Sequence, residues 1–193
     1  MSPEFARNLN ALGALAVCLV LVLAFYFQLV LYELPCPLCL LQRVGFVAVG
    51  FGLALNLLWG TRARNYGIVL VAAIFGISVS IRQILLHIVP GTGHYGSPVL
   101  GLHFYTWAGI AFGLVILGAA IMLVFEKQYD LASDVRATER FGGSQLAKTA
   151  FFVILVLAVL NAGSVLLECG PGICDDPPTD YKLLDELEGT ADS

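Results

Sequence analysis

Long uncharged segments rich in apolar residues constrain this chain more than any other feature. They span residues 8–32, 44–61, 65–81, 83–125 and 149–167. About 20 consecutive apolar residues are enough for a helix to cross a bilayer. With 59% hydrophobic and 12% charged residues, against roughly 45–50% and 25% in soluble domains, the composition is typical of a membrane protein. A large soluble catalytic domain is therefore excluded.

The segment 83–125 is too long for one span, and its Pro- and Gly-rich stretch at 90–98 predicts a loop. We therefore predict an all-α membrane protein with five spans. Their limits are 11–31, 40–59, 66–88, 102–125 and 149–167. We interpret the first span as an uncleaved anchor, because it is longer than the h-region of about 7–15 residues in a signal peptide.

Basic residues near the ends of the spans indicate the orientation. If the spans alternate, Lys182 lies alone on one side, and the other side carries Arg7, Arg62, Arg64, Lys127, Arg136, Arg140 and Lys148. The positive-inside rule then predicts a cytoplasmic N-terminus and cytoplasmic loops, with the tail outside. From Glu168 onward, eight acidic residues accompany Lys182. The tail thus carries the acidity, and the absence of a basic face argues against nucleic-acid binding.

Five cysteines occur, at positions 18, 36, 39, 169 and 174. In the predicted orientation, the last four face outward, on the oxidising side of a bacterial inner membrane, where disulfides persist. Cys18 lies in the middle of the first span, where a free cysteine packs as a small apolar side chain.

The segment 33–43 holds the first cysteine pair. Pro37 suits the first turn of a helix, so Cys36 should lie at the helix start and Cys39 within the first turn. A helix N-terminus and a nearby cation both stabilise a thiolate. Arg43 follows Cys39 by one turn on the same face, where it either serves the site or snorkels to the interface. We expect Cys36, between two prolines at the membrane surface, to be open to small thiols.

Three interpretations of this pair are open: a zinc site, a structural disulfide and redox exchange. Zinc would need further ligands, and a disulfide closing so short a loop adds little stability, so redox exchange explains more. The second pair, Cys169 and Cys174, is enclosed by Gly and Pro that favour a tight turn. It is either a structural clip or a shuttle that exchanges electrons with a soluble thiol protein.

The competing hypothesis is a non-catalytic membrane protein whose outer cysteines are structural or bind a metal. Arg43 argues against it, because a cation beside Cys39 would repel a bound metal ion. Neither pair forms part of a recognisable metal motif, and we predict no metal ligands.

The sequence resembles the bacterial disulfide bond formation protein B family over about residues 11–125. The specific core is Cys-Pro-Leu-Cys-Leu-Leu-Gln-Arg at 36–43, supported by Arg82-Gln83 and the stretch 101–107. The resemblance implies a four-helix bundle that oxidises a periplasmic thioredoxin-fold dithiol protein, DsbA-like, and delivers electrons to ubiquinone or menaquinone. It also implies that Cys39 lies next to the quinone and that Arg43 holds a quinone oxygen. A vitamin K epoxide reductase-like bundle shares this chemistry, but its cysteine pair lies toward the end of the bundle.

This chain departs from the usual family pattern, in which the second cysteine pair lies between the third and fourth spans. Residues 89–101 contain no cysteine, and the pair follows an additional fifth span. We predict four regions, which are a redox bundle (1–125), a cytoplasmic loop (126–148), the fifth span (149–167) and an acidic periplasmic tail (168–193).

The predicted catalytic residues are Cys36, Cys39, Cys169 and Cys174. The predicted quinone-binding residues are Arg43 and His87. His87, near the outer end of the third span, either reaches the quinone or makes an interfacial hydrogen bond.

Overall fold

The protein is all-helical in the residues that the computed structural model describes, which are 1–89, 91–93, 95–129 and 145–191. The elements are α1 (Pro3–Val30), α2 (Pro37–Trp59), α3 (Ala63–Leu86), α4 (Phe104–Val124), the 3-10 helix η1 (Glu126–Tyr129), α6 (Gln145–Cys169) and α7 (Lys182–Ala191). Five of them, α1 to α4 and α6, are long and apolar enough to cross a membrane. The all-α prediction with five long apolar helices is confirmed. Much of the predicted cytoplasmic loop, including Arg136 and Arg140, lies outside the described residues.

The helices differ from the predicted limits by a few residues at several ends, and the largest differences lie near the two ends of the chain. Helix α1 begins at Pro3 rather than at residue 11, because Ser2 caps it: the Ser2 hydroxyl accepts a hydrogen bond from the Phe5 N–H at 3.3 Å. Limits drawn from charge alone missed this start, since charged residues are tolerated in a terminal turn beyond the hydrocarbon. The acidic tail also contains a helix, α7, that was not predicted.

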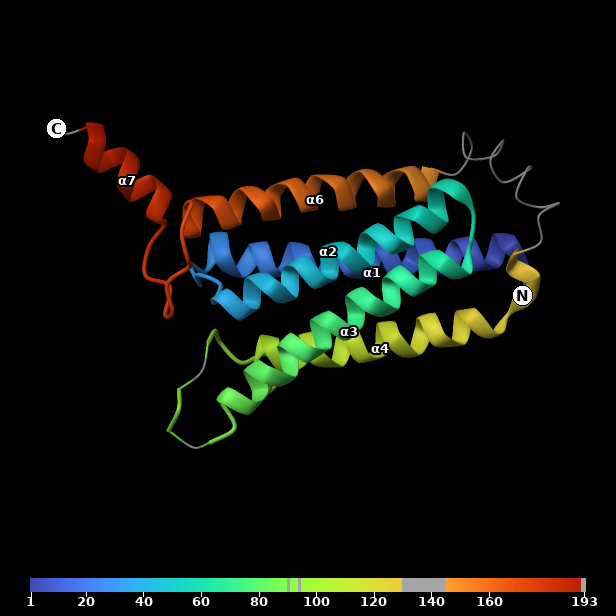
Figure 1. Ribbon diagram of the computed structural model, residues 1–193, viewed down its shortest axis with the longest axis horizontal. Helices are drawn as coiled ribbons and strands as arrows, with labels where there is room; N and C mark the ends of the chain where they lie inside the picture. The colour runs from blue at the N-terminus through green and yellow to red at the C-terminus, as the bar shows by residue number, and fades with distance from the viewer. Residues whose placement is uncertain (90, 94, 130–144, 192–193) are drawn as a thin grey trace.

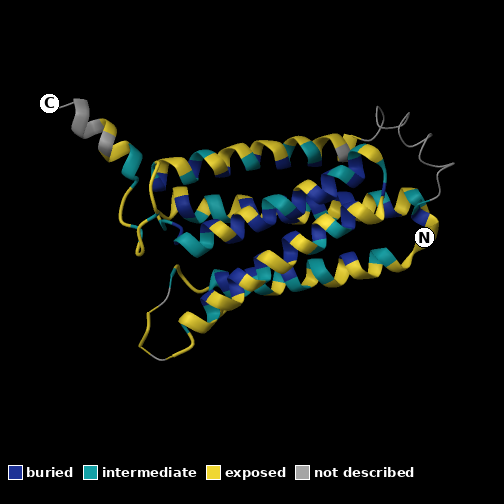
Figure 2. Cartoon of the chain, in the orientation of Figure 1, coloured by how far each residue is buried: buried dark blue, intermediate teal, exposed yellow. Residues whose placement is uncertain are grey.

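The helices form two groups around α2 (Figure 1). Helix α3 packs against both α2 and α4, whereas α6 lies against α1 and α2, on the side away from α4. Exposed residues follow the outward faces of the long helices (Figure 2), and many of them are large and apolar. In a membrane protein such faces contact lipid, so the exposed apolar side chains are consistent with a spanning bundle.

The core depends on a close approach among α2, α3 and α4. Phe46 and Phe112 stack with their ring centroids 4.0 Å apart, and Phe112 is fully buried. At Gly76 of α3, an added Cβ would lie only 2.2 Å from Cζ of Phe112. Small residues at such crossings let helices pack closely in lipid. A larger residue at position 76 would therefore clash with the Phe112 ring of α4.

The two ends of the bundle carry different groups. The end that holds Cys36, Cys39, Cys169 and Cys174, called the cysteine end here, joins the C-terminal ends of α1 and α6 to the N-terminal end of α2 (Figure 1). The opposite end holds the N-terminus, the connection between α2 and α3, and η1. Both ends contain buried polar side chains.

Candidate redox site

The first cysteine pair lies where the sequence predicted, at the start of a helix. Cys36 is the N-cap of α2, Pro37 is its first residue, and Cys39 lies in the first turn. Cys36 and Cys39 form a disulfide, and the Cys39 N–H donates to Cys36 Sγ at 3.1 Å. The backbone of the first turn is thus already aimed at the sulfur that would carry charge as a thiolate.

Gln83 of α3 completes this environment, and sequence reasoning gave it no role of its own. Its side-chain amide donates to Cys36 Sγ at 3.0 Å and approaches Cys39 Sγ at 3.5 Å. The side-chain oxygen of Gln83 in turn accepts a hydrogen bond from the side-chain amide of Gln42 at 2.8 Å. Gln83 is fully buried, whereas the adjacent Arg82 is exposed. The motif Arg82-Gln83 therefore contributes to the site through its amide rather than its charge.

The expectation that Cys36 is open to small thiols is wrong for the disulfide-bonded protein. Its exposed fraction is 2%, while Cys39 is half-buried. Packing of Gln83 against the sulfur, which local sequence does not reveal, contributes to this cover. Exchange at Cys36 thus requires local opening of the cysteine end.

A cavity of about 380 Å³ adjoins Cys39. It lies between α1, α2, α4 and the connection from α3 to α4, and most of its lining is apolar or aromatic. Its polar side chains include Cys39, Gln42 and Arg43, which lie on α2. Such a lining suits a flat, largely apolar ligand with a few oxygen atoms that need hydrogen bonds on one side.

The Arg43 side chain is turned inward and held in place. One guanidinium nitrogen donates to the Gln28 side-chain oxygen at 2.6 Å, and the other donates to the Ala24 carbonyl at 3.0 Å. The guanidinium carbon lies 5.3 Å from the centroid of the Phe25 ring, in cation–π range. Its residue exposure is only 7%. A snorkelling arginine would be exposed, so this burial favours a role in the site.

Gln28, the partner of Arg43, also contacts the fifth long helix. The Gln28 amide donates to the Ser164 hydroxyl at 2.8 Å and to the Tyr181 hydroxyl at 3.1 Å. Ser164 belongs to α6, and Tyr181 immediately precedes α7. Sequence reasoning assigned no role to Gln28, because an uncharged glutamine in a long apolar run gives little signal of its own.

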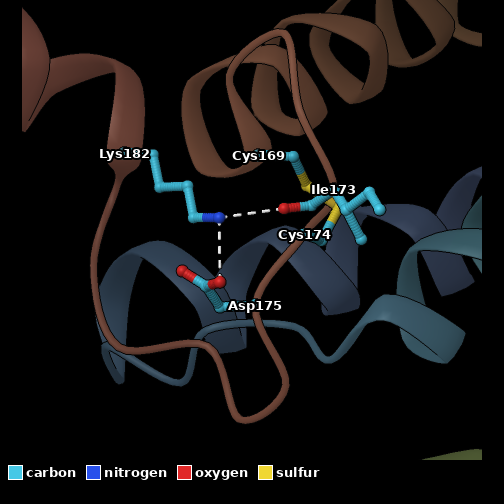
Figure 3. Close-up of polar contacts among 5 residues, drawn as sticks. All are labelled: Cys169, Ile173, Cys174, Asp175 and Lys182. Carbon is cyan, nitrogen blue, oxygen red and sulfur yellow. Dashed lines mark hydrogen bonds and ion pairs between the residues drawn. A yellow bond between two sulfur atoms is a disulfide. The ribbon is translucent and has the colours of Figure 1, made fainter.

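The second cysteine pair also forms a disulfide, between the last residue of α6 and Cys174 (Figure 3). Cys169 is 4% exposed, and Cys174 is half-buried. Lys182 reaches back across the loop, donating to the Ile173 carbonyl at 2.9 Å and pairing with Asp175 at 2.8 Å. The structure thus places this pair at the same end of the bundle as Cys36 and Cys39.

The connection from α3 to α4 contacts this tail. The Tyr95 hydroxyl donates to Asp176, and this hydrogen bond raises the pKa of Tyr95 to about 12. Tyr95 also lines the cavity. The same connection is held to the α1–α2 loop by Glu33, whose carboxylate accepts from the Ser97 hydroxyl at 2.6 Å.

His87 lies behind side chains that line the cavity and does not line the cavity itself. Its Nδ1 is 2.8 Å from the backbone carbonyl oxygen of Gln83. Its ring stacks on Tyr105, with the ring centroids 5.5 Å apart, and meets Tyr95 edge-on. Tyr95 and Tyr105 line the cavity, but His87 is not among the lining residues. Contact of His87 with a ligand would therefore be indirect.

Among the other histidines, His103 caps α4 and stacks on Tyr105 at 5.4 Å, while His94 lies outside the described residues. Within the part of the chain that the structure describes, no group of three or more His, Cys, Asp or Glu side chains could hold a metal ion.

These features define a class of protein: a helical membrane bundle with a Cys-x-x-Cys disulfide at the start of a helix, beside an apolar cavity that is lined in part by an arginine. Residues 6–94 match the family model described as disulfide bond formation protein DsbB. A disulfide bond formation protein B of Marinobacter nauticus is 34% identical over 140 residues, which cover 53% of this chain and 83% of the relative. The chain therefore belongs to the DsbB family. It is a multi-pass membrane protein of disulfide bond formation, with an oxidoreductase role.

Other relatives match a smaller part. A disulfide bond formation protein B of Xanthomonas euvesicatoria is 38% identical over 84 residues, or 41% of this chain and 49% of the relative. One of Chromobacterium violaceum is 42% identical over 71 residues, or 35% of this chain and 43% of the relative. The chain thus spans about half the length of these two relatives. No solved structure matches the chain. The family model ends before α4, so α6 and the second cysteine pair lie beyond it.

Proposed function

We propose that the protein is a protein-dithiol:quinone oxidoreductase, which oxidises a soluble dithiol protein and passes the electrons to membrane quinone. One observation carries this proposal: Cys39, Gln42 and Arg43 line the same apolar cavity, from successive turns of α2. The half-buried sulfur of a disulfide is thereby adjacent to fixed hydrogen-bond donors in an apolar space. This is the chemistry needed to hold a ring that carries carbonyl oxygens.

A bound quinone would accept the two electrons and two protons given up when a dithiol becomes a disulfide. The residues of this chain would bind and orient it. The buried guanidinium of Arg43 would hold one oxygen by charge-assisted hydrogen bonds, with Gln42 as a further donor. In the reduced pair, the Cys39 N–H and the Gln83 amide would stabilise charge on Cys36 Sγ. His87 would support Tyr105 rather than bind the ring directly.

We further propose that Cys169 and Cys174 form the shuttle pair. A partner thiolate attacks one sulfur, the other leaves as a thiolate, and the second partner thiol then resolves the mixed disulfide. The products are an oxidised partner and a reduced tail pair, which reduces Cys36–Cys39 by the same two steps. Cys174 is the more exposed residue of the pair and hence the proposed site of first attack. The burial of Cys36 supports a shuttle, because a folded partner would not reach it.

The partner would be a thioredoxin-fold dithiol protein of the periplasm, and the membrane would be the bacterial inner membrane. In this proposal the N-terminus is cytoplasmic and the tail periplasmic, because basic residues gather at the opposite end of the bundle. Residues 1–125 would form the quinone-linked unit. The remaining regions would be the cytoplasmic loop 126–148, the fifth span 149–167 and the tail 168–193. A reporter enzyme that is active only in the periplasm should be active when it is fused after Ser193. An expressed but inactive fusion would contradict this orientation.

The activity is tested with the purified full chain in detergent, a reduced thioredoxin-fold dithiol protein and a quinone. We expect quinol formation, followed by absorbance, in proportion to the dithiol oxidised. Absence of quinol formation by the folded protein would refute the proposed acceptor. Cys18→Ala is a matched control, because Cys18 is buried in α1 and takes no part in either disulfide.

The shuttle is tested with the double variant Cys169→Ser and Cys174→Ser. It should fail to oxidise the protein dithiol, while a small dithiol that enters on local opening still drives quinol formation. In Cys39→Ser, a mixed disulfide between Cys36 and Cys169 or Cys174 should accumulate and appear in non-reducing peptide maps. Oxidation of the protein dithiol at the normal rate by the double Ser variant would make the tail pair a structural clip.

A further inference from the structure

Helix α6 presents two polar side chains toward the site of Arg43. Ser164 and Glu168 are four residues apart and thus share one face of the helix. Ser164 bonds with both polar atoms of the Gln28 side chain, at 2.8 Å and 3.2 Å. Gln28 accepts from Arg43 at 2.6 Å. A continuous chain of hydrogen bonds therefore runs from the fifth long helix to the guanidinium in the cavity.

Glu168 is the more unusual member of this face. It is 4% exposed, and no hydrogen-bond donor among the described residues satisfies either of its carboxylate oxygens. Arg43 bonds to Gln28, and Gln28 bonds to Ser164, one turn before Glu168 on α6, so the guanidinium is the opposite charge on this side of the helix. A carboxylate buried without hydrogen bonds is costly unless an opposite charge is near. Packing alone would be better served by an apolar residue at this position.

We infer that Glu168 and Ser164 are positioning residues of the Arg43 site, Glu168 as its counter-charge and Ser164 as the anchor of Gln28. The inference rests on the proposed function and extends it, since it makes the fifth helix part of the quinone site. The family model matches only residues 6–94, so it does not include α6. In this chain, the added helix would then set the orientation and the effective charge of an arginine within the matched region.

The electrostatic role has a definite sign. A negative charge at Glu168 reduces the positive potential that Arg43 exerts on Cys39, one turn away on α2. Removing that charge should stabilise the thiolate form of the reduced pair. The equilibrium in which two glutathione molecules reduce Cys36–Cys39, yielding glutathione disulfide, should therefore shift toward the reduced pair. A purely structural role of Glu168 predicts no such shift.

The first test measures this equilibrium, which requires no quinone. The full chain in detergent is equilibrated with glutathione redox buffers, its thiols are alkylated, and Cys36 and Cys39 are quantified separately from the tail pair by peptide mass. Glu168→Gln should raise the equilibrium constant for reduction about three- to tenfold, whereas Glu168→Asp, which keeps the charge, should stay near wild type. Glu126→Gln is the matched control, because it removes the same charge from an exposed site at the opposite end.

The coupling to Arg43 is tested in the same assay. If Glu168 acts as the counter-charge of the guanidinium, Glu168→Gln should have a much smaller effect in an Arg43→Met background than in the wild-type chain, because a buried carboxyl without a counter-charge takes up a proton and is already neutral. Equal effects in both backgrounds would overturn the role as a counter-charge to Arg43. An unchanged equilibrium constant in a folded Glu168→Gln protein, with wild-type helicity and thermal stability, would also overturn it.

The second test addresses Ser164. Ser164→Ala removes the bonds that hold Gln28 to α6. It should raise the apparent KM for quinone severalfold with little change in kcat, because the orientation of the binding group changes and the sulfurs do not. Ser78→Ala is the matched control, since Ser78 is exposed and its hydroxyl donates to the Ile74 carbonyl of its own helix. An unchanged KM in Ser164→Ala would overturn the anchor role. If wild type forms no quinol, the proposed function fails, while the glutathione assay still decides the role of Glu168.

Discussion

The two ends of the bundle both contain buried polar side chains, but they use them differently. At the opposite end, side-chain amides bind one another: Asn56 donates to Asn10 at 2.9 Å, and Asn65 donates to Asn56 at 2.9 Å. Asn10 also donates to the Tyr66 hydroxyl at 2.7 Å. These bonds join α1, α2 and α3, and Gln128 of η1 extends the network through Tyr66. Their donors and acceptors are largely consumed in fastening helices together.

At the cysteine end, the polar groups face sulfur atoms and a cavity. Gln83 donates to Cys36, and Arg43 lines the cavity with only part of its donor capacity used by Gln28 and Ala24. The carboxylate of Glu168 has no hydrogen bond among the described residues. The comparison teaches that a closed polar network stabilises a membrane bundle, whereas one with unfilled donors and charges is available for chemistry.

The largest expected effect is a loss of activity at the cysteine end with little change in the stability of the bundle. Cys39→Ser should abolish quinol formation with either a protein or a small dithiol, because no disulfide remains beside the cavity. Thermal stability should change little, since the loop closed by this disulfide is short. Quinol absorbance and thermal unfolding in detergent measure the two effects. Residual quinol formation in Cys39→Ser would mean that electrons bypass Cys39.

The next effect concerns the charge at the cysteine end. Arg43→Met should raise the apparent KM for quinone about 10- to 150-fold, the equivalent of about 1.5–3 kcal/mol for one charge-assisted hydrogen bond. The Cys36–Cys39 disulfide should still form, as judged by alkylation. Steady-state kinetics at varied quinone concentration give the KM. Arg82→Met is the control, because Arg82 is exposed; equal effects in the two variants would contradict a specific role of Arg43.

At the opposite end, the expected effect is on stability. Asn56→Ala removes one donor and an oxygen that accepts from both Asn65 and the Arg62 N–H at 3.0 Å. We expect the free energy of unfolding to fall by about 1–2 kcal/mol, with unchanged quinone kinetics per folded molecule. Denaturant titration in detergent gives the first quantity. A change in quinone KM without a loss of stability would show that the two ends are coupled in function.

The smallest effect is expected where the tail meets the connection from α3 to α4. Tyr95→Phe removes the hydrogen bond to Asp176, which is exposed and should contribute only a few tenths of a kcal/mol. Trypsin cleavage after Lys182 should become about twofold faster, and Tyr26→Phe serves as the control. No change in cleavage rate would show that this bond does not restrain the tail.

The pH dependence of the same contact has a defined sign. Because the pKa of Tyr95 in the folded protein is raised to about 12, above its ordinary value of about 10, the contact is fully present below pH 10. It should be lost as the pH rises through about 12. The phenolate absorbance of Tyr95, obtained as the difference between the spectra of wild type and Tyr95→Phe, should therefore rise at about pH 12 rather than at about pH 10.

Several features of the site could be predicted from the sequence because they depend on local geometry. Pro37 placed Cys36 at a helix start, and a spacing of four residues put Arg43 one turn below Cys39. The burial of Cys36 could not be predicted in this way, because it depends on Gln83 from another helix. Gln28 and Glu168 gave too little signal in the sequence to be assigned a role.

What the sequence determined by itself is the all-α class and the five long apolar helices, because backbone polar groups in lipid must be satisfied within each segment. The tertiary structure decided which helix faces meet. Helix α4 is apolar on nearly all sides, so no polar stripe indicates how it is rotated. Only packing brings Ser164 against Gln28 and Glu168 into electrostatic range of Arg43. An apolar composition is sufficient for a helix to insert into the membrane, whereas side-chain packing and interhelical hydrogen bonds determine which helices it contacts.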